Sequence, residues 1–251
     1  SHIVLNAHKI NAGELITLDN KNKDFFFFEK KDVSSVMGAL VYLVKTRLPE
    51  YIGASPFEIQ VLTPMRKGEL GVEHLNEVLQ YYLNPASESK KEKEGRTGVF
   101  REGDKVMQVK NNYKLEWKIT NAKGFSIEEG LGVFNGDMGI IKQINTYSER
   151  ITVVFDENRE AEYPFSSLDE LELAYAITIH KSQGSEYPAV VLPLLSGPPI
   201  LCNRNLLYTA ITRAQKCVAI AGRQSMVEQM IHNETEQKRY SGLNDCLKEG
   251  L

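Results

Sequence analysis

The chain has 251 residues, of which 42% are hydrophobic and 25% are charged, and its formal net charge at pH 7 is −3. These values are typical of a soluble globular protein with one large or two modest domains, and they exclude nucleic-acid binding through overall basic charge. The sequence contains neither an apolar run of membrane-spanning length nor the basic and apolar regions of a signal peptide, so we expect no membrane partner.

The cysteines bear on the cellular localisation of the chain, and its first residues bear on whether it is a fragment. Cys202, Cys217 and Cys246 are odd in number and lack metal-ligand spacing, which favours reduced thiols and a cytoplasmic localisation. Residues 2–9 look like the tail of an element with no helix cap before it. We expect the chain to be a fragment of a longer protein; the alternative is a short, ragged start.

The first part of the chain predicts alternating strands and helices. The run FFFF is a strand, and the helix after it has Asp32 or Ser34 as its N-cap. Residues 57–62, FEIQVL, form a second strand that ends at Thr63, and a second helix stops before Pro85. Strand, helix, strand, helix is the order of a parallel sheet flanked by helices.

The middle of the chain has a different character. Residues 87–98 are charged and small, which predicts a mobile loop. Beyond them the apolar period becomes two, which predicts strands at 105–110 and 159–163 and a hairpin from 136–144 and 150–156. Short strands with tight turns indicate a small β-barrel of about 60 residues.

The strand and helix pattern then resumes. We expect strands at 173–177, 189–195 and 217–222, helices at 203–215 and 225–232, and a further helix beginning at Thr178. The polar tail is expected to be a marginal helix or a frayed end. The predicted fold is therefore α/β: a parallel sheet built from both ends of the chain, with a β-barrel inserted in its middle.

A first polar cluster, AITIHKSQGSEY, follows the strand at 173–177. A helix that begins at Thr178 would direct free backbone N–H groups and its positive dipole end at a ligand, which makes an anion site. His180 and Lys181 add cationic groups, Gly184 permits close approach, and Glu186 is able to accept from a ribose hydroxyl. The alternative is a capped helix on a solvated surface.

Two further cationic positions are expected at strand ends of the same sheet, where ligands of such sheets bind. Arg213 lies on a helix, four residues after Thr209, and a rigidly held guanidinium suits phosphate recognition. Arg66 and Lys67 come directly after a strand and before a glycine. The alternatives are an ordinary surface arginine and a solvated turn.

These strings together resemble motifs of the C-terminal motor domain of RecD-like superfamily 1 DNA helicases. TPMRKGELGVEHLN is similar to motif IV, AYAITIHKSQGSEYPAVVLPL to motif V and LLYTAITRAQK to motif VI, in the family's order. FREGDKVMQVKNNY and VFNGDMGII resemble that family's inserted Src-homology-3-like barrel. The resemblance implies a second RecA-like motor domain in residues 1–98 and 171–235, the barrel in 99–170 and a tail in 236–251.

The resemblance implies an ATP-dependent helicase of 5′ to 3′ polarity that uses Mg²⁺. No GxxxxGK[ST] phosphate loop occurs in this sequence. By resemblance that loop, and the acidic magnesium site, belong to a first RecA-like domain of the same polypeptide, so this chain by itself is not expected to hydrolyse ATP and no metal ligand is expected in it. The implied catalytic residues are Arg213, as arginine finger, and Arg66. The implied nucleotide-binding residues are Gln183, Gly184, Glu186 and Tyr208.

Single-stranded DNA is the second partner that the resemblance implies, and nuclease-complex subunits are a third. Thr178, His180, Lys181 and Ser182 are expected to touch DNA phosphates. In the barrel, Trp117 and Lys110 are expected to contact a single strand, because basic residues alternate with aromatic ones there; the alternative is a solvated loop with core aromatics. Two other functions stay open: a non-catalytic binding module with a degenerate helicase fold, and a relaxase or conjugative helicase.

Overall fold

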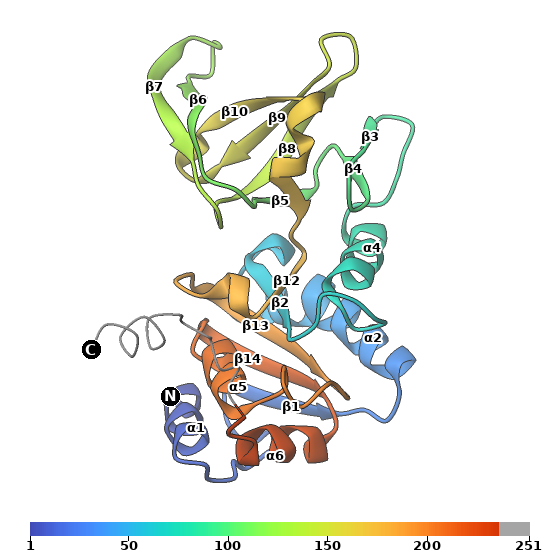
Figure 1. Cartoon of the computed structure of the whole chain (residues 1–251), viewed down its shortest axis with the longest axis vertical. Coiled ribbons are helices and arrows are strands. Elements are labelled where there is room, and N and C mark those ends of the chain that lie inside the picture. The colour runs from blue at the N-terminus through green and yellow to red at the C-terminus, as the bar shows by residue number, and fades with distance from the viewer. Residues whose placement is uncertain (236–251) are drawn as a thin grey trace, which may run out of the picture.

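The computed structural model describes residues 1–235, which form two large sheets, one above the other along the long axis of the molecule, and a small two-stranded sheet (Figure 1). The lower sheet is parallel throughout and takes strands from both ends of the chain, as predicted. The predicted tail, residues 236–251, lies outside the described residues. In spatial order the parallel strands are β1 (Phe25–Glu29), β14 (Ala214–Gly222), β13 (Tyr187–Leu194), β2 (Ile59–Thr63) and β12 (Ala176–Thr178).

Helices cover both faces of this sheet because its central strands are apolar on both sides. Val191 and Ala219 belong to the core shared with α2 and α4, whereas Val190 and Ile220 belong to the core shared with α5 and α6. The predicted cap at Asp32 is confirmed: its carboxylate accepts from the Ser35 backbone N–H. The helices are α1 (His2–Asn11), α2 (Val33–Tyr42), which continues through a π-helical turn (Leu43–Arg47) into α3 (Leu48–Ile52), α4 (Val72–Leu83), α5 (Arg204–Ile211) and α6 (Gln224–His232).

The upper sheet is antiparallel and is inserted between β2 and β12 of the parallel sheet. The predicted hairpin of β8 and β9 is confirmed. The hairpin of β6 and β7 was not predicted, because most of its side chains face solvent and the apolar alternation that marks a half-buried strand is missing. In spatial order the strands are β11 (Leu171–Leu173), β5 (Lys105–Gln108), β8 (Met138–Asn145), β9 (Arg150–Phe155), β10 (Glu160–Pro164), β6 (Asn112–Thr120) and β7 (Ser126–Val133).

Two sequence-based expectations between the sheets are wrong. The loop predicted to be mobile, residues 87–98, contains β3 (Glu92–Glu94), which pairs with β4 (Val99–Arg101) directly after the loop. Arg101 Nε donates to Glu92 at 2.6 Å, and Phe100 is buried. The single strand predicted at 173–177 is two strands in two sheets: β11 pairs with β5, and β12 pairs with β2. Apolar periodicity could not separate them, because both strands are buried.

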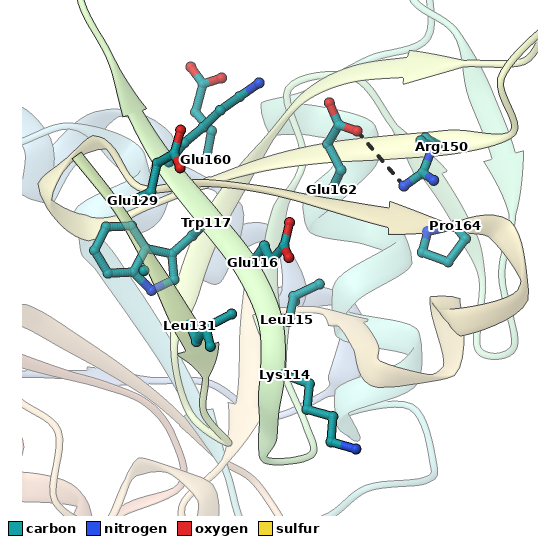
Figure 2. A pocket seen from close by; sticks show the side chains of 12 residues that line it. Lys114, Leu115, Glu116, Trp117, Glu129, Leu131, Arg150, Glu160, Glu162 and Pro164 are labelled. Atoms are coloured by element: carbon teal, nitrogen blue, oxygen red, sulfur yellow. Dashed lines mark ion pairs between the residues drawn. The ribbon is translucent and has the colours of Figure 1, made fainter. Parts of the chain in front are cut away.

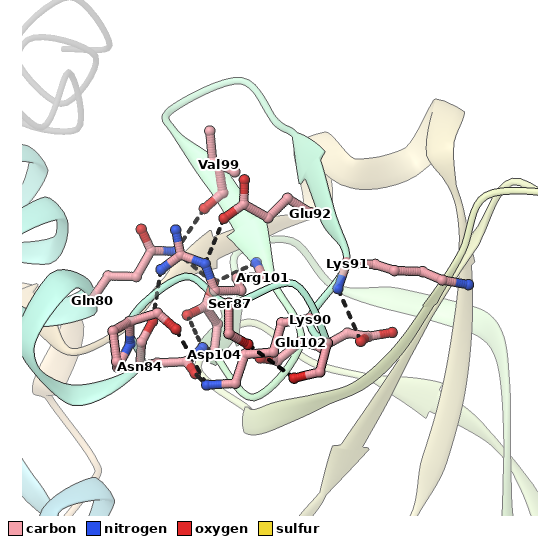
Figure 3. Close-up of polar contacts among 12 residues, drawn as sticks. Gln80, Asn84, Ser87, Lys90, Lys91, Glu92, Val99, Arg101, Glu102 and Asp104 are labelled. Atoms are coloured by element: carbon pink, nitrogen blue, oxygen red, sulfur yellow. Dashed lines mark hydrogen bonds and ion pairs between the residues drawn. The ribbon is translucent and has the colours of Figure 1, made fainter.

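A buried polar network joins the two sheets where the chain crosses between them (Figure 3). The Asp104 carboxylate accepts from Gln80 Nε2 (2.7 Å), Asn84 Nδ2 (2.8 Å), Tyr175 Oη (2.8 Å) and the Arg101 backbone N–H (2.6 Å). Burial raises the pKa of Asp104, and these donors oppose the shift. The network is thus satisfied by neutral donors, as a desolvated charge requires.

The next residue, Lys105, makes the complementary connection to the parallel sheet. Its ammonium is buried and donates to Phe57 O (2.7 Å) and to Gln60 Oε1 (2.8 Å), and burial lowers its pKa to about 7. On α4, Asn76 adds hydrogen bonds to the backbone of Leu173 and Ala176, where the chain returns. Hydrogen bonds therefore tie both crossings between the sheets to β2 or to α4.

Candidate functional site

The polar clusters predicted at the strand ends lie at two opposite edges of the parallel sheet. Thr63 and Thr178 are register partners at the carboxyl ends of β2 and β12, so the segments after them begin at one edge. Arg213 comes directly before β14, whose first residue is the register partner of Tyr187 at the amino end of β13. The expectation that Arg213 lies at a carboxyl end is therefore wrong, because α5 brings the chain back to the amino edge before β14 begins.

At the carboxyl edge, Arg66 and Lys181 converge on one carboxylate. Arg66 Nη2 lies 2.7 Å from Glu172 Oε1, and Lys181 Nζ lies 4.0 Å from Glu172 Oε2. A weaker contact of 3.8 Å joins Arg66 Nε to Glu73. The hydrogen bond to Glu172 raises the pKa of Arg66, whereas burial lowers the pKa of Lys181 and the nearby charge of Arg66 adds to that shift. Sequence reasoning missed Glu172, since it belongs to β11 of the other sheet.

The prediction that a helix begins at Thr178 is wrong. The segment contains one 3₁₀ turn, His180–Ser182. Register shows why. Residues 179–186 must return from the level of Thr178 to that of Tyr187, six strand residues or about 20 Å. A helix of this length would span only about 12 Å. The N–H groups of Lys181 and Ser182 are satisfied within the turn, by Thr178 Oγ1 and Ile179 O, so they form no open anion site.

The residues of this turn differ in exposure. His180 is exposed, and Thr178 and Lys181 are half-buried. Ser182 is buried, and its hydroxyl donates to Ile179 O at 2.6 Å, so in this structure it stabilises the turn and presents no surface to DNA. Gly184 has φ +84° with open space where a Cβ would lie, so the backbone conformation, not packing, requires glycine there.

At the amino edge, Arg213 is held beside the end of the same segment. Its Nη1 donates to Ser185 O (3.2 Å), its Nε to Thr209 O (3.3 Å) and its Nη2 to Thr212 Oγ1 (3.3 Å). Glu186 lies close by and accepts from Gln215 Nε2 at 3.2 Å. Gln183, Gly184 and Glu186 are exposed, and Tyr208 is half-buried against the core. The structure thus brings Arg213 together with the segment that contains Gly184 and Glu186, and it does not bring Arg66 to them.

Tyr187 is a second residue that sequence reasoning missed. Its hydroxyl is buried and has no hydrogen-bond partner among the described residues. Burial raises the pKa of this hydroxyl, and the neighbouring Ser185 side chain and the Arg213 charge oppose the shift. A buried polar atom without a partner is costly in a protein interior, and this one lies near Arg213 at the amino edge.

In the upper sheet, Trp117 lines a pocket of about 660 Å³ (Figure 2). The indole lies across Gly130, where a Cβ would come within 2.3 Å of the ring, and the Arg159 guanidinium lies 5.6 Å from the ring centroid. The expectation of a basic groove around Trp117 is wrong, because β7 and β10 contribute carboxylates that offset the basic side chains. Lys110 is not among the lining residues; it forms an ion pair with Asp169. The charged lining residues are Glu116, Glu129, Glu160 and Glu162 against Lys114, Lys118 and Arg150.

No group of three or more His, Cys, Asp or Glu side chains within residues 1–235 could hold a metal ion. No helix of the described part is long and apolar enough to cross a bilayer.

Comparison with known proteins agrees with these motifs. Residues 75–155 match the family described as the ATP-dependent RecD-like DNA helicase SH3 domain, and residues 173–221 match the UvrD-like helicase C-terminal domain. The ATP-dependent RecD2 DNA helicase of Deinococcus radiodurans is 39% identical over 167 residues, 66% of this chain and 20% of that protein. The RecBCD enzyme subunit RecD of Mycolicibacterium smegmatis is 30% identical over 191 residues, 76% of this chain and 29% of that protein.

Among solved structures, a Bacteroides Pif1 helicase in complex with ADP-AlF3 and ssDNA aligns with a TM-score of 0.49 at 19% identity, over 99% of this chain and 54% of that chain. This chain spans less than a third of either curated relative. The two family matches and the parallel sheet with its antiparallel insertion identify the chain as a C-terminal RecD-like helicase domain of α/β RecA-like fold, with an inserted SH3-like domain.

Proposed function

We propose that this chain is the second motor domain of an ATP-dependent DNA helicase that moves 5′ to 3′, and that Arg213 is its arginine finger. The supporting observation is the guanidinium of Arg213, held by three hydrogen bonds at the amino edge beside the exposed Gly184 and Glu186. A fixed cation stabilises the charge that develops during phosphoryl transfer. The phosphate loop and the Mg²⁺ site would come from a first RecA-like domain, with which the amino edge would form the ATP site.

In this proposal each edge has its own ligand. At the amino edge, Glu186 would accept from the ribose, with Gln183, Gly184 and Tyr208 around the nucleotide. At the carboxyl edge, Thr178, His180, Lys181 and Arg66 would contact single-stranded DNA, which assigns Arg66 to DNA and not to ATP. Residues 179–186 join the two edges directly, so closure on ATP at one edge would move the DNA contacts at the other.

The inserted domain would extend the DNA path. Trp117 has an aromatic surface at a pocket, and Lys110 lies on the same sheet, so we keep both as proposed contacts to a single strand. The mixed charges around Trp117, four carboxylates against three cations, would favour contact with bases over contact with phosphates.

Arg213→Ala in the complete helicase tests the proposal. ATP turnover should fall at least about a thousandfold, because the arginine finger acts on the transition state. Affinity for single-stranded DNA should stay within about twofold, because Arg213 is at the other edge. Turnover is measured by phosphate release and DNA affinity by fluorescence anisotropy.

The matched control is Arg223→Ala, which removes an exposed arginine after the carboxyl end of β14 and should leave turnover unchanged. An equal loss of ATP turnover and DNA affinity in Arg213→Ala would show that Arg213 only maintains the fold. ATP turnover by the isolated chain, free of contaminating ATPase, would contradict the proposal that the phosphate loop lies on another domain.

A further inference from the structure

Glu172 forms a bridge at the carboxyl edge that no motif of the sequence indicated. Its two carboxylate oxygens are divided between two cations: Oε1 accepts from Arg66 Nη2 at 2.7 Å, and Oε2 lies 4.0 Å from Lys181 Nζ. The three residues come from three segments: β11 of the inserted sheet, the loop after β2 and the 3₁₀ turn after β12. A carboxylate held in this way occupies the position between two cations in which a phosphate would also fit.

The three side chains are accessible to an exchanging ligand. The exposed fractions are 41% for Arg66, 30% for Lys181 and 20% for Glu172, so water reaches each of them. The Arg66 side chain contributes one nitrogen to the 2.7 Å hydrogen bond and makes no other hydrogen bond within residues 1–235. Its Nε lies 3.8 Å from Glu73, so the further N–H donors open to a ligand are those of the two Nη groups. Guanidinium groups bind carboxylate and phosphate with the same forked geometry, so one anion is able to replace the other.

We propose that Arg66 and Lys181 form one phosphate subsite for the backbone of single-stranded nucleic acid, and that the Glu172 carboxylate is its built-in occupant, which an incoming phosphate displaces. The inference rests on the proposed function, and it adds an internal competitor to it. The free protein would be kept from binding anions non-specifically, because each phosphate must first replace Glu172.

Displacement of Glu172 also affects the inserted domain. Glu172 lies on β11, which pairs with β5, and the next residue, Leu173, is held to α4 by Asn76. When the ion pairs of Glu172 break, β11 would lose its direct contact with the two segments that contain Arg66 and Lys181. Occupation of the subsite would in this way be transmitted to the inserted sheet.

The test is the affinity of the 251-residue chain for a fluorescein-labelled oligothymidine at low salt, measured by anisotropy. Glu172→Gln keeps the side-chain volume and removes the competing charge, so affinity should rise about three- to fivefold, as expected when a part-exposed ion pair no longer has to be broken. Arg66→Ala should weaken binding about tenfold or more. In the Arg66→Ala background, Glu172→Gln should lose most of its effect.

The matched control is Glu92→Gln in the β3–β4 hairpin. It removes a carboxylate that accepts a hydrogen bond from Arg101 Nε at 2.6 Å, and it changes the net charge by the same amount as Glu172→Gln. Glu172→Asp is the second variant; it keeps the charge but withdraws the carboxylate by one methylene, and should raise affinity less than Glu172→Gln. Thermal melting confirms that the variants are folded. A parallel titration with Mg²⁺-ATP identifies which phosphate the subsite accepts.

The outcomes separate the inference from the proposed function. If oligothymidine binds and Glu172→Gln behaves as Glu92→Gln does, the inference is overturned while the proposed function stands. A rise in affinity for Mg²⁺-ATP, without one for oligothymidine, overturns the assignment to nucleic acid. If no variant binds oligothymidine, the DNA contact proposed for this edge is wrong, and the inference is overturned with it.

Discussion

Two groups of charged residues join the inserted sheet to the parallel sheet, and they differ in how much water reaches them. Asp104 is 0% and Lys105 6% exposed, and neutral amides, hydroxyls and carbonyls fill their hydrogen bonds. Arg66, Lys181 and Glu172 are part-exposed and compensate one another by charge. A desolvated charge depends on fixed partners and therefore serves the fold, whereas a hydrated ion pair costs little to open and can serve a ligand.

The largest effect is expected for Asp104→Asn, which keeps the shape of the side chain. An amide has one acceptor oxygen, so two of the four donors around Asp104 would face an NH₂ group. The free energy of unfolding should fall by about 2–4 kcal/mol, the cost of leaving buried donors unpaired. Urea unfolding followed by circular dichroism measures it. A change under about 0.5 kcal/mol would mean that the buried network contributes no more to the free energy of unfolding than an exposed ion pair does.

A smaller, pH-dependent effect is expected for Lys105→Met. The pKa of Lys105 is lowered from its ordinary value near 10.5 to about 7 in the folded chain, so between these values the unfolded chain binds more protons. The wild type should therefore gain stability relative to Lys105→Met as pH rises above 7, by about 1–2 kcal/mol between pH 7.5 and 9. Urea unfolding of both proteins at the two pH values gives the difference. A constant difference would show that Lys105 does not titrate in this range.

Much of the fold could be predicted, because burial on both faces gives parallel strands nearly continuous apolar runs. The strands around Val61, Val191 and Ile220 and the cap at Asp32 follow from such local signals. Sequence reasoning also found the segments that contain Arg66, Lys181 and Arg213. Their separation onto two edges depends on strand order and register, which no local pattern specifies.

The buried polar network around Asp104 has a pattern in the sequence from which part of it could have been predicted. Asn76, Gln80 and Asn84 follow one another at intervals of four along α4 and its C-cap, next to the apolar stripe of Leu75 and Leu79. Polar amides repeated on one helix face beside a core indicate a buried polar partner. The partner itself, Asp104, could not be named from the sequence. Neither could the carboxylates that β7 and β10 bring to Trp117, because these strands come close to it only in the fold.

The smallest effect on stability is expected for Glu172→Gln, the part-exposed counterpart of Asp104→Asn. A hydrated ion pair contributes about 0–1 kcal/mol, so the free energy of unfolding should change by less than about 1 kcal/mol. Salt makes the comparison sharper. At 1 M salt the Debye length is about 3 Å, so the effect of Glu172→Gln should vanish, whereas that of Asp104→Asn should persist because water and ions do not reach the buried carboxylate. If added salt removed both effects equally, burial would not be what distinguishes the two groups, and Glu172 would lose its standing as the replaceable one.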